Sequence, residues 1–140
     1  MTGGSPFPAE GGRDCKGSSS AGPFSAVQTY AHLGADGRSV PLQVTPTFWQ
    51  ELAAGSLSHL GPGRLVSTYD FHADWATWEK HPAGEELVVL IAGALELILS
   101  TDGGEQRVVL NTPGQFAIVP RDTWHTADLA ASALALFITA

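Results

Sequence analysis

The sequence is poor in cysteine and in charged residues, and each shortage narrows what the protein can be. Cys15 is the one cysteine among 140 residues, which excludes an intrachain disulfide framework and suits a reducing compartment. Charged residues make up 15% of the chain, and the formal net charge is −7. The seven basic residues stand singly, at Arg13, Lys16, Arg38, Arg64, Lys80, Arg107 and Arg121. We therefore expect neither nucleic acid nor an anionic membrane as a partner.

Long hydrophobic runs are also absent. No run approaches the roughly 18 apolar residues of a membrane span, and no basic stretch followed by an apolar one marks a secretory signal. Hydrophobic residues nevertheless make up 44% of the sequence, enough for the core of one ordinary domain. The expectation is a soluble, cytoplasmic, single-domain protein.

The first part of the chain divides into three regions. Residues 1–24 are rich in Gly, Ser and Pro without an apolar period, which predicts a disordered tail ahead of a folded domain at 25–140. Two short strand-like runs come next, at Val27–His32 and Val40–Val44. One short helix is then expected, with Thr47 and Gln50 as a capping box and Gly55 at its end.

After residue 63 the apolar pattern has a period of two and keeps it to the C-terminus. Seven runs show this pattern and are separated mostly by turn residues: Arg64–Phe71, Trp75–His81, Glu86–Ala92, Leu95–Ser100, Gln106–Leu110, Gln115–Val119 and Ala133–Thr139. Many short strands at such spacings are typical of a sandwich or barrel. The pattern predicts an all-β fold with its core barrel at about 64–139.

Two segments of this region carry polar residues that favour a site. Glu79 and His81 are two positions apart in a run expected to be extended, so both side chains project from one face. A loop then brings Glu86 to the start of the next strand, and His125 comes after a Pro-x-Asp turn at the end of a later one. If the sheet closes, two imidazoles and one or two carboxylates converge inside it.

These segments resemble the two conserved motifs of the cupins. The first motif runs His-x-His, three or four residues, Glu, six residues, Gly; His81, Glu86 and Gly93 fit its second histidine, its glutamate and its glycine. The second runs Gly, five residues, Pro-x-Gly, two residues, His, and Gly114, Pro120 and His125 match it. The sequence departs from the motifs at three positions: Glu79 stands at the first histidine, Asp122 at the usual glycine, and Leu129 at an asparagine that is often found after the second motif's histidine.

The resemblance implies a single cupin double-stranded β-helix, or jelly-roll, barrel that pairs as a homodimer. It also implies that His81, Glu86 and His125 bind a divalent transition metal ion such as Fe, Mn, Ni or Zn. Glu79 has three readings: a fourth metal ligand, a catalytic acid or base beside the ion, or an ordinary ion-pair partner at the rim. Two carboxylates buried without a cation would repel each other, so either a metal neutralises them or Glu79 turns outward.

The leading hypothesis is a metal-binding cupin that acts on a small polar organic molecule as a dioxygenase, isomerase or lyase. The main alternative is a non-catalytic cupin that binds or senses a small ligand, with or without metal, and a purely structural barrel is a third reading. Trp75 is read as plain core or as a pocket wall. Glu85 is expected in solvent, and His32, His59 and His72 have no motif support.

Overall fold

The computed structural model of the protein describes residues 21–140, and within them nine strands and one α-helix. Most of the predicted tail at 1–24, together with Cys15, lies outside the described residues. The strands are β1 (Thr29–Gly34), β2 (Ser39–Gln43), β3 (Gly63–Phe71), β4 (Glu86–Gly93), β5 (Leu95–Thr101), β6 (Gly104–Leu110), β7 (Phe116–Val119), β8 (His125–Asp128) and β9 (Ala133–Thr139). No helix among the described residues is long and apolar enough to cross a membrane.

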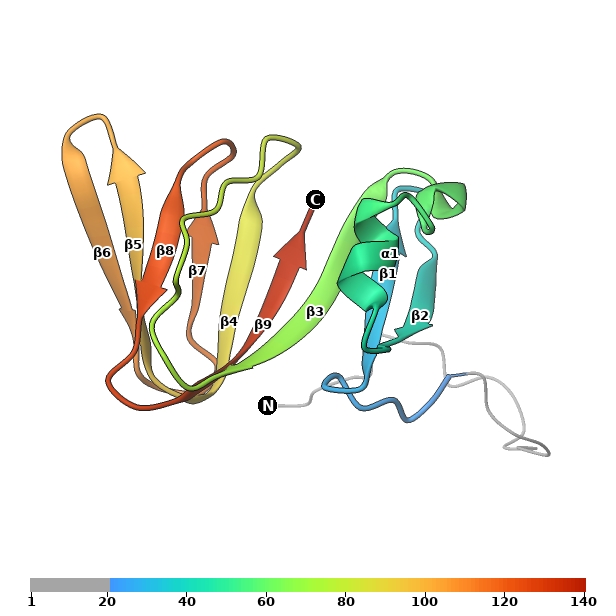
Figure 1. The fold of residues 1–140 in the computed structure, drawn as a ribbon, viewed down its shortest axis with the longest axis horizontal. Helices are drawn as coiled ribbons and strands as arrows, with labels where there is room; N and C mark the ends of the chain where they lie inside the picture. The colour runs from blue at the N-terminus through green and yellow to red at the C-terminus, as the bar shows by residue number, and fades with distance from the viewer. Residues whose placement is uncertain (1–20) are drawn as a thin grey trace, which may run out of the picture.

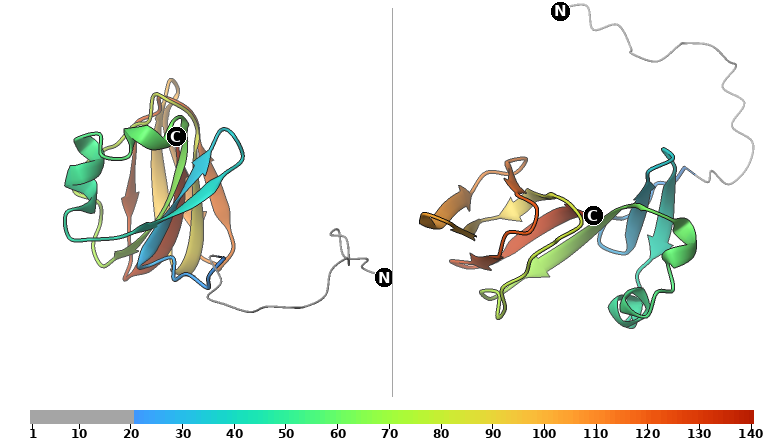
Figure 2. Two further views of the ribbon diagram at one scale, coloured as in Figure 1. Left: turned by 90° about the vertical axis from the view of Figure 1, so that its right-hand side faces the viewer. Right: turned by 90° about the horizontal axis from the view of Figure 1, so that it is seen from above.

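The strands form two antiparallel sheets that face each other (Figures 1 and 2). The larger sheet has the order β2-β1-β3-β9-β4-β7, and the smaller one has the order β6-β5-β8. Their inner faces enclose a core that includes Val88, Leu90, Leu97 and Val119, each at most 1% exposed. Alternate residues of β4, β7 and β9 are buried, which is the period of two that the sequence predicted. The prediction of an all-β jelly-roll fold with one short helix is confirmed.

The prediction of a strand at Trp75–His81 is wrong. Within that segment only Glu79 forms a β-bridge, opposite His125, and the rest runs as loop between β3 and β4. A strand that the sequence did not predict, β8, begins at His125 and pairs with β5 in the smaller sheet. Its four residues, His-Thr-Ala-Asp, carry too few apolar side chains for alternation to mark them.

The helix α1 (Phe48–Ala53) begins and ends where the sequence predicted, with Thr47 at its N-cap position, but it lacks the predicted capping bond. Thr47 precedes it without a side-chain capping bond, so the capping box is wrong. At its other end, the Gly55 N–H donates to Leu52 O and the Ser56 N–H donates to Glu51 O, each at 3.0 Å, the pair of bonds of a Schellman motif. With β1 and β2, α1 lies beyond β3, outside the barrel (Figure 1).

Candidate metal centre

Hydrogen bonds hold the two motif segments against each other. Glu79 and His125 exchange two bonds of 2.8 Å, each N–H donating to the other residue's carbonyl. The Asp122 N–H donates to His81 O at 2.9 Å, and the Arg121 guanidinium donates to Ala83 O at 2.6 Å. The loop before β4 is thereby fixed to the turn before β8, and the side chains that both segments carry come together between the sheets.

The turn before β8 depends on Asp122. This residue has a φ of 59°, a left-handed conformation that glycine adopts freely and that aspartate tolerates better than most residues. The replacement of the motif's glycine by aspartate therefore preserves the backbone path that leads to His125.

Glu86 lies at the centre of the cluster. It is the first residue of β4 and is 3% exposed. Its Oε1 lies 3.2 Å from Nε2 of His125, and its Oε2 accepts a hydrogen bond of 2.6 Å from the Thr139 hydroxyl. Thr139 has no place in the motifs, but it lies on the buried-side register of β9 with Ala133, Ala135 and Phe137, so strand alternation could have identified it.

His125 is fully buried, and a contact of its Nδ1 fixes the orientation of its ring. Its Nδ1 lies 2.9 Å from the carbonyl oxygen of Thr123. A carbonyl can only accept, so Nδ1 carries a proton and Nε2 faces Glu86. A histidine whose Nδ1 is bound in this way presents the lone pair of its deprotonated Nε2 in a fixed direction, as metal-binding histidines do.

His81 supplies a buried nitrogen that the described residues leave without a hydrogen bond. Its Nε2 lies 3.1 Å from Glu86 Oε2, within the distance of an ion pair, but that contact does not have the geometry of a hydrogen bond. A buried polar atom without a hydrogen bond is costly unless another partner, such as an ion, meets it.

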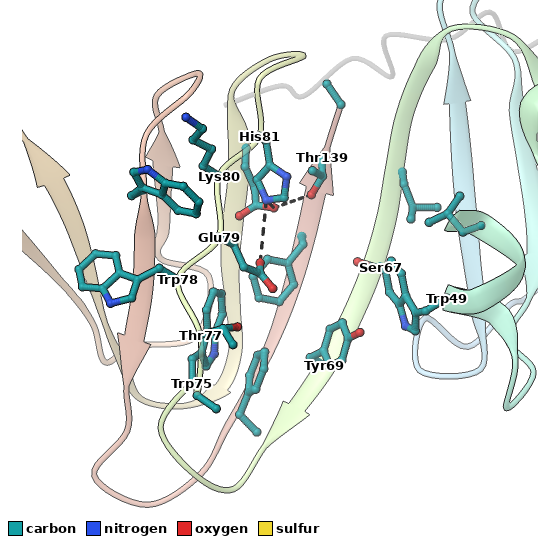
Figure 3. Close-up of a pocket in the computed structure, with 18 of the residues that line it drawn as sticks. Trp49, Ser67, Tyr69, Trp75, Thr77, Trp78, Glu79, Lys80, His81 and Thr139 are labelled. Carbon is teal, nitrogen blue, oxygen red and sulfur yellow. Dashed lines mark hydrogen bonds and ion pairs between the residues drawn. The ribbon is translucent and has the colours of Figure 1, made fainter. Parts of the chain in front are cut away.

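Glu79 completes a group that has the geometry to hold an ion. One ligand atom each from Glu79, His81 and His125 lies within 4.8 Å of the others. Figure 3 shows Glu79 beside His81, with Glu79 Oε2 4.0 Å from His81 Nε2. The Glu79 side chain is 51% exposed, so only one of the two carboxylates is buried. Two imidazole nitrogens with carboxylate oxygens are a donor set that suits divalent transition metals, so the residues present fit such an ion.

The charges of Glu86 and His125 stabilise each other. Burial opposes the charge on Glu86, but contacts from His125, His81 and Thr139 outweigh it and lower the pKa of the carboxyl from 4.5 to about 2. Burial likewise opposes the charge on His125, while Glu86, the Thr123 carbonyl and the charge of Glu79 raise the pKa of its ring. Without an ion, Glu86 and His125 therefore each favour the charged form of the other.

A large pocket opens onto this cluster. Its volume is about 940 Å³, and Glu79, His81 and Glu86 lie among its lining residues together with many aromatic side chains (Figure 3). Trp75 lines it and also packs against the core, so both readings of that residue hold. Tyr69 and Trp49 line it too, and neither belongs to a motif by which the sequence could have marked it.

The remaining histidines lie apart from the cluster's hydrogen bonds and ion pairs. His72 is exposed and lies 3.5 Å from Asp70, and His59 contacts the Ser56 carbonyl. His32 lines the pocket but belongs to β1. Glu85 is exposed, as expected.

The motif segments meet where the two sheets face each other. Glu86 begins a strand of the larger sheet and His125 begins a strand of the smaller one, with His81 in the connection before β4. This is the two-sheet arrangement that the paired motifs implied. The chain has a cupin-type fold.

Solved structures similar to this fold include several cupins. A cupin-2 domain protein from Shewanella frigidimarina is 16% identical with a TM-score of 0.46, over 54% of this chain and 68% of its own. A cupin superfamily protein from Desulfitobacterium hafniense is 19% identical with a TM-score of 0.46, over 54% and 65%. Hydroxypropylphosphonic acid epoxidase from S. wedmorenis is 16% identical with a TM-score of 0.48, over 55% and 43%, so the chain spans less than half of that protein.

No protein-family model and no curated protein sequence matches the chain. No activity or ligand follows from structural likenesses of this size.

Proposed function

We propose that this protein binds a divalent transition metal ion through His81, His125 and Glu86, with Glu79 as a further ligand or as the proton donor and acceptor beside the ion, and acts on a small polar organic molecule in the adjoining pocket. The convergence of ligand atoms from Glu79, His81 and His125 within 4.8 Å carries the proposal. The buried Nε2 of His81, which makes no hydrogen bond within residues 21–140, supports it. Iron, manganese, nickel and zinc are all compatible with this donor set.

The residues around the ion have different proposed roles. A bound ion would polarise an oxygen of the ligand and leave coordination positions open for it. Thr123 and Thr139 orient His125 and Glu86 through hydrogen bonds of 2.9 and 2.6 Å. Glu79, half exposed at the pocket, is placed to accept or donate a proton on the ligand. Proton movement beside a metal fits the oxygenase, isomerase and lyase classes alike.

Metal content tests the proposal directly. The wild-type protein, purified without chelator or reconstituted with Fe(II), Mn(II), Ni(II) or Zn(II), is expected to hold one ion per chain. His81→Ala should lose most of it, whereas His72→Ala, which removes an exposed histidine outside the cluster, should retain it. Wild-type protein that holds no stoichiometric ion under any of these conditions would end the metalloprotein reading.

A loss of metal in His125→Ala could come from misfolding, because His125 is fully buried. Glu79→Gln separates the two causes, because its side chain is half exposed and its replacement leaves no cavity. We expect this variant to unfold like the wild type and to bind metal more weakly if Glu79 is a ligand, or equally well if Glu79 acts only on the proton. In a substrate screen, oxygen consumption would then identify the oxygenase class.

A non-catalytic ligand-binding module is the second candidate. It is favoured by one observation: Glu86, His125 and Thr139 satisfy one another by hydrogen bonds and charge without an ion. In that case small molecules stabilise the metal-free protein against heat, and a chelator leaves its melting temperature unchanged. Under either function, the homodimer and the cytoplasmic location expected from the sequence stand as predictions.

A further inference from the structure

We infer that the pocket beside the candidate metal centre binds an aromatic molecule with its ring against a row of four aromatic side chains, and that without a bound ion the pocket disfavours a negatively charged molecule. The row, called here the aromatic row, consists of Trp49, Tyr69, Phe71 and Trp75. The inference deepens the proposed function, on which it relies for the polar end of the ligand. The ring site itself stands on the aromatic row alone.

The aromatic row is continuous. Ring centroids lie 5.7 Å apart from Trp49 to Tyr69, 5.3 Å from Tyr69 to Phe71 and 5.3 Å from Phe71 to Trp75. The first two pairs are stacked, with interplanar angles of 26° and 16°. Three elements contribute to it, namely α1, β3 and the loop after β3, so the fold assembles the row from distant parts of the sequence.

The row combines exposed aromatic surface at one end with the metal centre at the other. Trp49 and Tyr69 remain 40% and 39% exposed although both line the pocket (Figure 3). At the other end, the ring of Trp75 lies 6.1 Å from that of His125. A planar ligand on the row would cover apolar surface and would direct a substituent toward His81 and Glu79.

The charges around the pocket disfavour an anion. Its acidic lining residues are Asp74, Glu79 and Glu86, and its one Lys or Arg is Lys80. The Lys80 ammonium is already engaged, because it lies 3.4 Å from Asp122 Oδ1 and 5.0 Å from the centroid of the Trp124 ring. In the protein without a bound ion, a carboxylate or phosphate on the ligand would therefore meet acidic side chains without a free lysine or arginine to pair with.

Three small probes isolate these features. Benzamide has a flat ring and no charge, cyclohexanecarboxamide has the same amide without the flat ring, and benzoate has the same ring with a negative charge. Their dissociation constants would be measured by ligand-observed NMR. The two amides are compared on the protein as purified, and benzoate is compared with benzamide on protein treated with chelator, so that coordination by its carboxylate does not contribute.

We expect benzamide to bind more tightly than cyclohexanecarboxamide by about two- to tenfold, the range that aromatic pairing supplies. Benzoate should bind at least about fivefold more weakly than benzamide. Tyr69→Leu and Trp49→Leu should each reduce the ratio between the two amides toward one. Tyr69→Phe, which keeps the ring, should preserve that ratio, as should Phe24→Leu, which removes an exposed aromatic residue outside the pocket.

The inference is overturned if benzamide does not bind at millimolar concentration, if benzoate binds as tightly, or if Tyr69→Leu leaves the amide ratio unchanged. Metal content measured on the same samples separates this failure from failure of the proposed function. A wild-type protein that prefers benzamide but holds no metal would keep the ring site and lose the metal proposal. One that holds metal without any preference between the amides would do the reverse.

Discussion

Glu86 is the residue on which the candidate site depends most. Its buried carboxylate is hydrogen-bonded by His125 and Thr139 and lies 3.1 Å from His81 Nε2. Removing its charge therefore weakens its contacts with all three residues. We expect Glu86→Gln to destabilise the metal-free protein by about 2–4 kcal/mol, measured by urea unfolding. Glu85→Gln, at the exposed neighbouring position, is the matched control and should change stability by less than about 0.5 kcal/mol. Equal effects of the two variants would contradict this account of the site.

The same carboxylate predicts how the metal-free protein responds to acid. Because the pKa of Glu86 is lowered from 4.5 to about 2, its contribution to stability is complete above about pH 4.5 and is lost as the pH falls toward 2. Over that range the loss should be on the order of 3 kcal/mol. The pKa of His125 is raised from 6.5, so its contribution is complete below that value and falls as the pH rises.

Urea midpoints measured across the pH range would test this, with a maximum expected between the two transitions. In Glu86→Gln the acid limb should flatten, because the group that gains the protons is gone. A variant that loses stability in acid as steeply as the wild type would assign the acid response to other carboxylates.

At the residue scale, the sequence identified the cluster but not its internal roles. The motif spacings brought together Glu79, His81, Glu86 and His125, and the structure places them side by side. The sequence did not predict how far each residue is buried. Glu79 is half exposed because it lies in the loop after β3, and Glu86 is buried because it begins a central strand. Roles as metal ligands stay a prediction until an ion is measured.

At the scale of elements, the turn between β4 and β5 depends on Gly93. This glycine has a φ of 78°, and a Cβ added to it would overlap the carbonyl of Ser132. Gly93→Ala is therefore expected to destabilise the protein by at least about 2 kcal/mol, because it combines left-handed backbone with a clash against backbone.

The control is Gly103→Ala, in the turn between β5 and β6, where an added Cβ meets nothing within 4 Å. It should shift the melting temperature little. Comparable losses in the two variants would show that the general conformational freedom of glycine, rather than the close approach at Gly93, sets the effect.

Alternation of side chains predicted strands correctly in the sheets, but it failed in the loop between β3 and β4. Residues Ala133–Thr139 were predicted as a strand and form β9 with those bounds, since every second residue faces the core. The segment Trp75–His81 shows similar alternation, yet most of its residues are exposed around the pocket and only Glu79 forms a bridge. Alternation in the sequence indicates which side chains could share a face. Hydrogen bonding to a neighbouring strand decides whether the backbone forms a strand.

At the scale of the whole molecule, the outer face of the larger sheet is apolar where it crosses β4, β7 and β9. Phe116 and Ile118 of β7 are 57% and 53% exposed and point away from the core. Across the ladder they pair with Val89 and Leu87 of β4, and those in turn with β9 residues that are also apolar: Leu136 and Ile138. A contiguous face of this kind on an edge strand and its neighbours is typical of a protein interface.

We propose that this face joins two copies of the chain, which is the homodimer that the resemblance implied. A stable pair needs roughly 800 Å² of each partner, so the contact must extend over several strands rather than over β7 alone. Sedimentation velocity should find a dimer for the wild type and a monomer for the double variant Phe116→Glu, Ile118→Glu. Val109→Glu, at a similarly exposed position on β6 of the other sheet, should remain dimeric.

The proposed interface and the candidate metal centre lie on opposite faces of the same strands. In β4, Glu86 is buried on the inner face while Leu87, next to it, points outward. A monomeric double variant should therefore keep its metal and its preference for benzamide, because neither Phe116 nor Ile118 lines the pocket. If the double variant loses both its metal and its dimer, the interface affects Glu86 through β7 and β4. The metal site is then complete only in the dimer.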